Sequence, residues 1–297
     1  MLTQTNEEAV IIVALIRKHG LKCQLIQSND GFRYMNMAEV RYFLKQIEKD
    51  THTPLIADEV WDKAKRKTSA AYAVSKSLPY LECCIRLFEM TNKAKYLTDF
   101  KDFVFESSVE DFCDTAGADV VVSTIHKAKG REFDDVYMLL TQQRSINDDV
   151  MRRYYVGMTR AKKHLSVHTN SMIFNGFPAD KTVIDPNQYE MPEEISLQLS
   201  HKDVNLGFFK TIKKEILSLR SGDELSYDNN LFLNPKTSHA VAQLSQKMRS
   251  ELQQWEDKGY HVSEASIRFI VAWRPKDAPK GEKEHAIILT DLTMRRA

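Results

Sequence analysis

The hydrophobic and polar positions in the middle of the chain follow the pattern of a buried parallel sheet. Asp119–Ile125 is rich in β-branched residues and predicts a strand buried on both faces, and Val136–Leu140 predicts a second. After Asn147, Asp148 can cap a helix whose apolar residues recur at helical spacing. Leu165–His168 then returns as a strand. The middle of the chain therefore predicts an α/β fold.

Weaker patterns flank this region. An amphipathic helix is predicted from about Glu7 to Lys18 and ends at His19-Gly20, and a short strand follows at Cys23–Gln27. The stretch Asn170–Glu194 contains three prolines and little periodicity, so it is the best linker in the chain. Strands at Ala265–Trp273 and His285–Leu289 predict a hairpin. The other predicted helices are one ending near Lys49, and Ile56–Lys76, Leu78–Lys93, Leu97–Phe105, Asp203–Leu219 and Thr237–Lys258.

Composition excludes several classes of protein. The 297 residues are 42% hydrophobic and 28% charged, as in a globular protein with room for two domains. The formal net charge is +1, so a surface that binds nucleic acid must be local. No long apolar run or signal-like start points to a membrane or to export. The four cysteines lack metal-ligand spacing, so no metal site is expected, and Cys83 and Cys84 predict core positions in a reduced cytoplasm.

The most specific residues lie in two stretches. Val120–Val136 reads VVVSTIHKAKGREFDDV, and Arg152–Lys163 reads RRYYVGMTRAKK. A lysine-rich loop with one glycine lets a backbone amide approach a phosphate while the cations neutralise it. Arginine stabilises the charge that develops on a transferred phosphoryl group. A lysine-rich loop alone is more often a solvated turn, but two long motifs in this order favour a nucleotide or nucleic-acid site.

Both stretches closely resemble the last two signature motifs of superfamily 1 DNA helicases of the UvrD/Rep kind. The resemblance implies a second RecA-like domain at residues 1–170, whose parallel sheet has helices on both faces and whose helical insertion is reduced to residues 51–114. It implies ATP and Mg²⁺, both held mainly by an amino-terminal RecA-like domain of the same protein, and single-stranded DNA as a partner. Residues 171–195 then form a linker, and residues 196–297 form a small α+β module that the resemblance does not reach.

The resemblance assigns roles at the nucleotide residue by residue. Gly130 is expected near the γ-phosphate, Glu132 at the ribose hydroxyl and Arg160 as an arginine finger. Arg152 matches the second arginine of the family's usual pair, and Met151 stands where the first is expected. A further departure is an arginine at position 131, where the family has leucine.

The expected nucleic-acid contacts lie in two parts of the chain. Thr124, His126 and Lys127 belong to the first motif, whereas Arg33 and Tyr34 belong to a turn that resembles the family's fourth motif region. Aromatic and cationic groups together suit single strands. The alternative is that Tyr34 packs in the core and Arg33 is a surface charge. A basic run, usually a solvated helix face, is kept open as a DNA contact: Lys63, Lys65, Arg66 and Lys67.

The leading hypothesis is the second motor domain of an ATP-dependent UvrD-like DNA helicase. No Gly-x-x-x-x-Gly-Lys-Ser/Thr loop occurs in the 297 residues, and Leu2 opens as though a strand had been cut. The sequence is therefore expected to be a fragment that does not hydrolyse ATP alone. The alternative is a degenerate helicase domain that binds nucleic acid or a partner without catalysis. Intact Gly130, Glu132 and Arg160 favour the motor.

Overall fold

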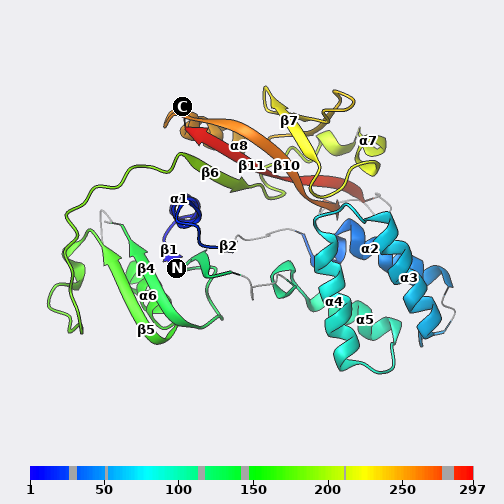
Figure 1. The fold of residues 1–297 in the computed structure, drawn as a ribbon, viewed down its shortest axis with the longest axis horizontal. Helices are drawn as coiled ribbons and strands as arrows, with labels where there is room; N and C mark the ends of the chain where they lie inside the picture. Colours follow the sequence, from blue (N-terminus) through cyan, green and yellow to red (C-terminus); the bar gives the residue numbers. More distant parts are fainter. Residues whose placement is uncertain are drawn as a thin grey trace. The chain divides into compact units, whose positions relative to one another are not determined.

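The structure is a computed structural model in which the chain forms two compact units (Figure 1). It describes residues 1–26, 32–50, 53–112, 118–141, 147–210, 212–275 and 284–296. Unit 1 consists of residues 1–28 and 114–195, and unit 2 of residues 29–113 and 196–297. The domain boundaries expected near residues 170 and 195 stay a prediction.

Unit 1 is built on a parallel sheet with the strand order β2-β3-β1-β4-β5. Leu2 pairs with Ser123 on one side and Met138 on the other, so β1 lies at the centre. The prediction of a parallel α/β sheet is confirmed. Its strands are β1 (Leu2–Thr3), β2 (Cys23–Ile26), β3 (Val120–Thr124), β4 (Phe133–Leu140) and β5 (Ala161–Thr169).

Helices cover both faces of this sheet, as expected. α1 (Asn6–Lys18) packs Val13 against Val122 of β3. α6 (Asp148–Met158) packs Val150 in a second core with Ile125, which follows β3. Side chains an odd number of positions apart on a strand point to opposite faces, so the two cores lie on opposite sides of the sheet.

The ends of these helices follow from local hydrogen bonds. Thr5 and Glu8 form a reciprocal capping box at the start of α1, and Gly20, with φ +78°, follows its end. The cap of α6 is Asn147 rather than Asp148, because the side-chain Oδ1 of Asn147 accepts a 3.0 Å bond from the Val150 amide. Asp148 is the first helical residue, where its charge favours the helix dipole.

Four helices form the first part of unit 2, around buried aromatic rings. The Trp61 ring lies 5.1 Å from Phe43, 5.0 Å from Phe100 and 5.9 Å from Phe88, measured between ring centroids. The predicted helices of this region are confirmed, although α3 is shorter than expected. Their bounds are α2 (Ala38–Asp50), α3 (Asp58–Ala71), α4 (Leu78–Thr91) and α5 (Leu97–Glu106), with 3₁₀ turns η1 (Tyr34–Asn36) and η2 (Val109–Asp111).

The second part of unit 2 is a sheet with the order β6-β11-β10-β7-β8-β9. β10 and β11 pair in antiparallel fashion, which confirms the predicted hairpin, and both run further than expected. An α+β module is therefore confirmed. Its elements are β6 (Glu194–Gln198), η5 (Phe208–Lys210), α7 (Lys213–Leu217), β7 (Glu224–Asp228), β8 (Leu231–Leu233), β9 (Ala240–Gln243), α8 (Gln246–Glu256), β10 (Tyr260–Trp273) and β11 (His285–Arg296).

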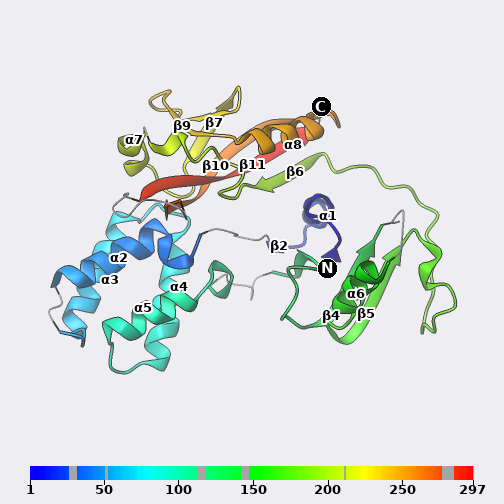
Figure 2. The same cartoon turned by 180° about the vertical axis from the view of Figure 1, so that it is seen from behind.

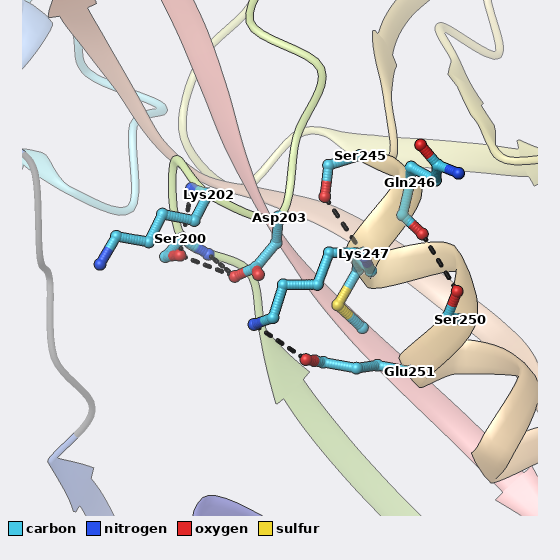
Figure 3. Close-up of polar contacts among 9 residues, drawn as sticks. Ser200, Lys202, Asp203, Ser245, Gln246, Lys247, Ser250 and Glu251 are labelled. Carbon is cyan, nitrogen blue, oxygen red and sulfur yellow. Dashed lines mark hydrogen bonds and ion pairs between the residues drawn. The ribbon is translucent and has the colours of Figure 1, made fainter.

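Two helix predictions in this module are wrong. Asp203–Leu219 contains only η5 and α7, and Thr237–Lys258 contains β9 before α8 begins. α8 begins where Ser245 caps it, since the Ser245 hydroxyl accepts a 3.3 Å bond from the Met248 amide (Figure 3). In the same view, Lys247 pairs with Glu251 at 2.9 Å, one turn further along α8.

The helices and the sheet of unit 2 share one core. The Phe269 ring of β10 lies 5.7 Å from the rings of Phe32 and Tyr80. The Lys76 amide donates a 2.9 Å bond to the Ser221 carbonyl. Segments separated by more than a hundred residues in sequence therefore stabilise one another.

A buried carboxylate lies at the start of α2. Glu39 is 2% exposed, and its Oε1 accepts bonds from the hydroxyls of Ser75 at 2.6 Å and Ser77 at 2.7 Å. Both serines are buried in the turn between α3 and α4. This turn therefore depends on Glu39 for its side-chain hydrogen bonds.

Candidate nucleotide and nucleic-acid site

Residues 125–132 form a crossover loop in unit 1. It runs from the end of the sheet where the parallel strands finish, the carboxyl edge, to the end where they begin, the amino edge. Ser123 and Met138 lie level across Leu2 in the strand register. Thr124 therefore ends β3 near the carboxyl edge, whereas Phe133 begins β4 at the amino edge. Ligands of open α/β sheets bind in loops beyond the carboxyl ends of the strands, and on this rule all of His126–Phe133 is expected there. The structure corrects this, because the loop runs back along the sheet to reach β4.

Two small apolar contacts hold the crossover loop against the sheet. Ile125 and Ala128 are 4% and 0% exposed and belong to the core beneath α6. The side chains of His126, Lys129 and Arg131 are exposed or half-buried. The loop thus has a fixed path and a polar outer surface.

The carboxyl-edge cluster consists of Thr124, His126, Lys127 and Asn6. Thr124 is 7% exposed, and its carbonyl accepts bonds from the amides of Lys127 at 3.0 Å and Ala128 at 3.1 Å. His126 is exposed, and the Lys127 ammonium donates a 3.0 Å bond to the Asn6 side chain. The three expected single-strand contacts of this motif are therefore brought together beside the start of α1.

A polar network next to this cluster was missed by sequence reasoning. The Thr141 hydroxyl, after β4, lies 2.9 Å from both Gln4 Oε1 and Glu8 Oε1. The Gln4 amide donates a 2.9 Å bond to the Tyr154 hydroxyl of α6. The Thr-x-x-Glu capping box at Thr5 was the sequence signal that could have placed Glu8 at this edge.

Arg160 lies at the amino edge of the sheet and contacts residues of both motifs. Its Nε donates to the Val156 carbonyl at 3.0 Å, and one terminal nitrogen donates to the Arg131 carbonyl at 3.2 Å. The other terminal nitrogen donates to the Thr159 hydroxyl at 3.1 Å. A guanidinium has five N–H donors, so each terminal nitrogen keeps one N–H beyond these contacts, counted over the described residues. The side chain is thus fixed in place and still able to donate.

Gly130 and Glu132 lie in the same loop end. Gly130 has φ +86°, in the left-handed region that favours glycine, and a Cβ there would meet no atom within 4 Å. Its requirement for glycine is therefore conformational. The Glu132 carboxylate lies 3.6 Å from the Lys162 ammonium, and both are exposed. Arg131, between them, supplies the carbonyl that Arg160 contacts, so the departure from the family's leucine leaves that contact intact.

A second ion pair lies beside this loop end. Lys163 donates a 2.7 Å bond to the Asp134 carboxylate. The hydrogen bond from Lys163 and its positive charge lower the pKa of Asp134, and the same bond and the negative charge of Asp134 raise the pKa of Lys163. Two ion pairs, Glu132 with Lys162 and Asp134 with Lys163, therefore lie where β4 and β5 begin.

Arg152 lies apart from these contacts. Its side chain is 78% exposed and lies 3.7 Å from Asp149, one turn earlier on α6. Met151, in place of an expected arginine, is 41% exposed. The expected nucleotide contact of Arg152 stays a prediction.

Arg33 and Tyr34 belong to unit 2. Tyr34 is 1% exposed, its hydroxyl donates to the Tyr80 carbonyl, and burial raises its pKa. Core packing, the alternative considered from the sequence, is thus the environment of Tyr34. Arg33 is exposed, with its guanidinium carbon 4.2 Å from the centroid of the Phe105 ring. Their contact with a strand stays a prediction.

Two kinds of feature are absent from the part of the chain that the structure describes. No group of three or more His, Cys, Asp or Glu side chains there could hold a metal ion. None of the helices described is long and apolar enough to cross a membrane.

A five-stranded parallel sheet covered on both faces, with residues of the two motifs at its edges, fits a RecA-like α/β fold. Residues 119–168 match the family model of the UvrD-like helicase C-terminal domain. This match, over 50 of the 297 residues, makes this stretch similar to the C-terminal domain of UvrD/Rep-type superfamily 1 helicases.

Curated proteins that are similar to this chain are named DNA helicase II or a probable homolog of it. A probable DNA helicase II homolog of Rickettsia felis is 30% identical over 145 residues, which cover 41% of this chain and 21% of the relative. The DNA helicase II of Rickettsia typhi is 32% identical over 143 residues, with the same coverage of each chain. The matched part of the chain thus spans about a fifth of the length of these relatives.

Proposed function

We propose that this chain is the second motor domain of an ATP-driven DNA helicase. In this function Arg160 stabilises the charge that develops on the γ-phosphate, Gly130 lies beside that phosphate and Glu132 accepts a bond from the ribose hydroxyl. ATP and Mg²⁺ are held mainly by an amino-terminal RecA-like domain that carries the phosphate loop, which this sequence lacks.

The observation that carries the proposal is the position of Arg160. Contacts from all three guanidinium nitrogens fix the side chain, two of them to backbone carbonyls of the two motifs. A preorganised cation spends little free energy on reorganisation when charge develops on a phosphoryl group. The remaining N–H donors on the terminal nitrogens supply the hydrogen bonds that such a group accepts.

The carboxyl-edge cluster supplies the proposed grip on single-stranded DNA. Lys127 and exposed His126 offer donors to a phosphate, and the Thr124 turn fixes the backbone between them. Closing and opening of the cleft between two RecA-like domains during ATP turnover then shifts this grip along the strand.

The test is the single-stranded-DNA-stimulated ATPase rate of this domain joined to a domain with an intact phosphate loop. Arg160→Ala is expected to reduce the rate by about a thousandfold, the scale of an arginine finger. Arg160→Lys keeps the charge but not the fork of donors, so most of the loss should remain. Arg153→Ala removes an exposed arginine from α6, seven residues before Arg160, and serves as the matched control, with a rate close to wild type.

Two outcomes would contradict the proposed motor function. Equal losses of ATPase rate in the Arg160→Ala and Arg153→Ala proteins would mean that Arg160 has no specific role in the reaction. No stimulated ATPase in a folded wild-type protein that still binds single strands would favour the alternative, a degenerate domain that binds nucleic acid without catalysis.

A further inference from the structure

Arg131 is a cation of the crossover loop to which the proposed function gives no role. It lies between Gly130 and Glu132, where the loop reaches β4. Figure 2 shows α6 lying along β4 and β5, and Arg160 follows α6 in the chain. The Arg131 carbonyl accepts the 3.2 Å bond from a terminal nitrogen of Arg160. The backbone of residue 131 therefore lies directly against the proposed arginine finger.

The Arg131 side chain is half-buried and has no hydrogen bond or ion pair with the residues that the structure describes. Three carboxylates follow it closely in the chain, and each is bound to a basic residue at the start of β5. These pairs are Glu132 with Lys162 at 3.6 Å, Asp134 with Lys163 at 2.7 Å and Asp135 with His164 at 2.6 Å. The carboxylates of this edge therefore do not neutralise the positive charge of Arg131.

Further hydrogen-bond donors are available at this end of the loop. The Gly130 amide has no hydrogen bond with a described residue, and a Cβ on Gly130 would meet no atom within 4 Å, so the backbone is open to a ligand. Each terminal nitrogen of Arg160 keeps one N–H beyond its described contacts. An arginine keeps its charge at neutral pH and offers a planar fork of N–H groups to phosphate oxygens. Together these donors suit an anion with several acceptor oxygens, such as the terminal phosphate of a nucleotide.

We propose that Arg131 binds the γ-phosphate of ATP in the ground state, as a second cation beside Arg160. This inference rests on the proposed function and adds to it a residue that determines affinity. Contacts from all three guanidinium nitrogens fix Arg160, and such a preorganised group acts on charge that develops in the transition state. The Arg131 side chain lacks such contacts among the described residues, so the ligand itself must order it. A contact made before the reaction lowers the KM for ATP without raising kcat.

The site at Arg131 is separate from the contacts proposed for DNA. Ser123, near the carboxyl edge, lies level with Met138, five residues after Phe133 at the amino edge. At about 3.3 Å for each residue of a strand, these two levels are roughly 16 Å apart. A single phosphate group cannot span this distance. A phosphate held at Arg131 is therefore a different group from any held at Lys127.

The test measures binding of inorganic tripolyphosphate to the 297-residue chain by isothermal titration calorimetry. Arg131→Leu removes the charge and keeps an apolar side chain, whereas Arg131→Lys keeps the charge without the fork of donors. Arg153→Leu, which removes an exposed arginine from α6, is the matched control. Arg131→Leu should bind tripolyphosphate about tenfold more weakly, the scale of a charge-assisted hydrogen bond, and Arg131→Lys within about threefold of the wild type. The control should keep the wild-type affinity.

The same variants, in the protein joined to a phosphate-loop domain, separate affinity from rate. Arg131→Leu should raise the KM for ATP about tenfold and change kcat by less than about twofold, and Arg131→Lys should recover most of the KM. Inhibition by ADP, which lacks the γ-phosphate, should not change. Higher salt should reduce the difference in KM, because the contact is electrostatic and only half-buried. A purely structural role of Arg131 would instead disturb Arg160 and lower kcat.

Several results would overturn the proposal. In the chain alone, they are no tripolyphosphate binding by the wild type, wild-type affinity in Arg131→Leu, or an equal loss in Arg131→Leu and Arg153→Leu. In the joined protein, they are a fall in kcat at unchanged KM, or ADP inhibition weakened as much as the KM. Thermal unfolding at the wild-type temperature in every variant assigns any loss to the contact rather than to folding.

Two controls separate this inference from its neighbours. Anisotropy of a labelled oligothymidine should show wild-type binding in Arg131→Leu, and its loss in place of tripolyphosphate binding would assign Arg131 to DNA and overturn the proposal. Failure of the proposed function gives a different result. The joined protein would then show no stimulated ATPase, while the chain alone would still bind tripolyphosphate through Arg131, so the phosphate contact would stand without the motor.

Discussion

The two units use their most distinctive side chains in opposite ways. In unit 1, Arg160 and the polar side chains of the crossover loop are exposed or half-buried, and backbone carbonyls fix Arg160 at the edge of a parallel sheet. In unit 2, the corresponding side chains are buried aromatic rings around Trp61, which is 1% exposed. Substitutions in unit 1 should therefore change activity with little loss of stability. Substitutions in unit 2 should change stability first.

The largest expected effect is on the stability of unit 2. Trp61→Ala removes a ring that contacts three others and should lower the free energy of unfolding by about 3–5 kcal/mol. All three tryptophans, Trp61, Trp255 and Trp273, lie in unit 2, so fluorescence during urea unfolding follows this unit. Met90→Ala in the same unit, at a side chain that is 76% exposed, is the control and should change stability by less than about 0.5 kcal/mol. A similar loss in both variants would contradict the comparison.

The next effect concerns the buried carboxylate of unit 2. Ser77→Ala removes the 2.7 Å bond to Glu39 Oε1 and should cost about 1–3 kcal/mol, because Glu39 cannot replace the donor with water. The same urea experiment measures it. Ser69→Ala, an exposed serine on α3, is the control and should be close to neutral. A neutral Ser77→Ala would mean that Ser75 alone satisfies the carboxylate.

A smaller effect separates strain from function in unit 1. Gly130→Ala and Gly176→Ala each place a side chain at a left-handed φ, +86° and +87°, with no atom within 4 Å of the new Cβ. Each should cost about 1–2 kcal/mol of stability. In the ATPase assay with the phosphate-loop domain, only Gly130→Ala is expected to reduce the rate. Equal rates in the two variants would place Gly130 outside the nucleotide site.

The smallest effect is a titration at the amino edge. Lys163 holds the pKa of Asp134 below its usual range, so the ion pair contributes stability above that range and loses it as the pH falls through the lowered pKa. Lys163→Gln should raise the pKa of Asp134 toward its usual value, as followed by NMR of the carboxyl carbon. Lys181→Gln, exposed in the segment after β5, should leave it unchanged. If the pKa of Asp134 is the same in Lys163→Gln as in the wild type, the ion pair between Asp134 and Lys163 is not the cause of the lowered pKa.

The same contrast explains which parts of the structure could be predicted. The sheet of unit 1 follows from β-branched runs and motifs that lie within about fifty residues, so Val120–Thr124 and the helix after Asn147 were predictable. The packing of Phe269 against Phe32 and Tyr80 has no local signal, because it joins segments far apart in the sequence. The side-chain contacts of Arg160 could likewise not be predicted from the sequence, although Arg160 could be named there as a candidate site residue.

Some signals were present in the sequence but unused. Asn229 and Asn230 both have positive φ and form the tight turn between β7 and β8, and adjacent asparagines are a known mark of such turns. Ser245 marks the true start of α8. The helix predicted from Thr237 failed because the apolar residues of β9, Val241 and Ala242, also fit a helical repeat.

The crossover loop has a consequence for how the two edges of unit 1 communicate. Six residues, 125–130, connect Thr124 to Arg131, whose carbonyl accepts the bond from Arg160. Ile125 and Ala128 are fixed in the core, so the loop has little slack in which to absorb a displacement. Under the proposed function, a shift of Arg160 during phosphate release would pull on His126 and Lys127 directly. A single short segment of the chain would then couple ATP turnover to strand binding.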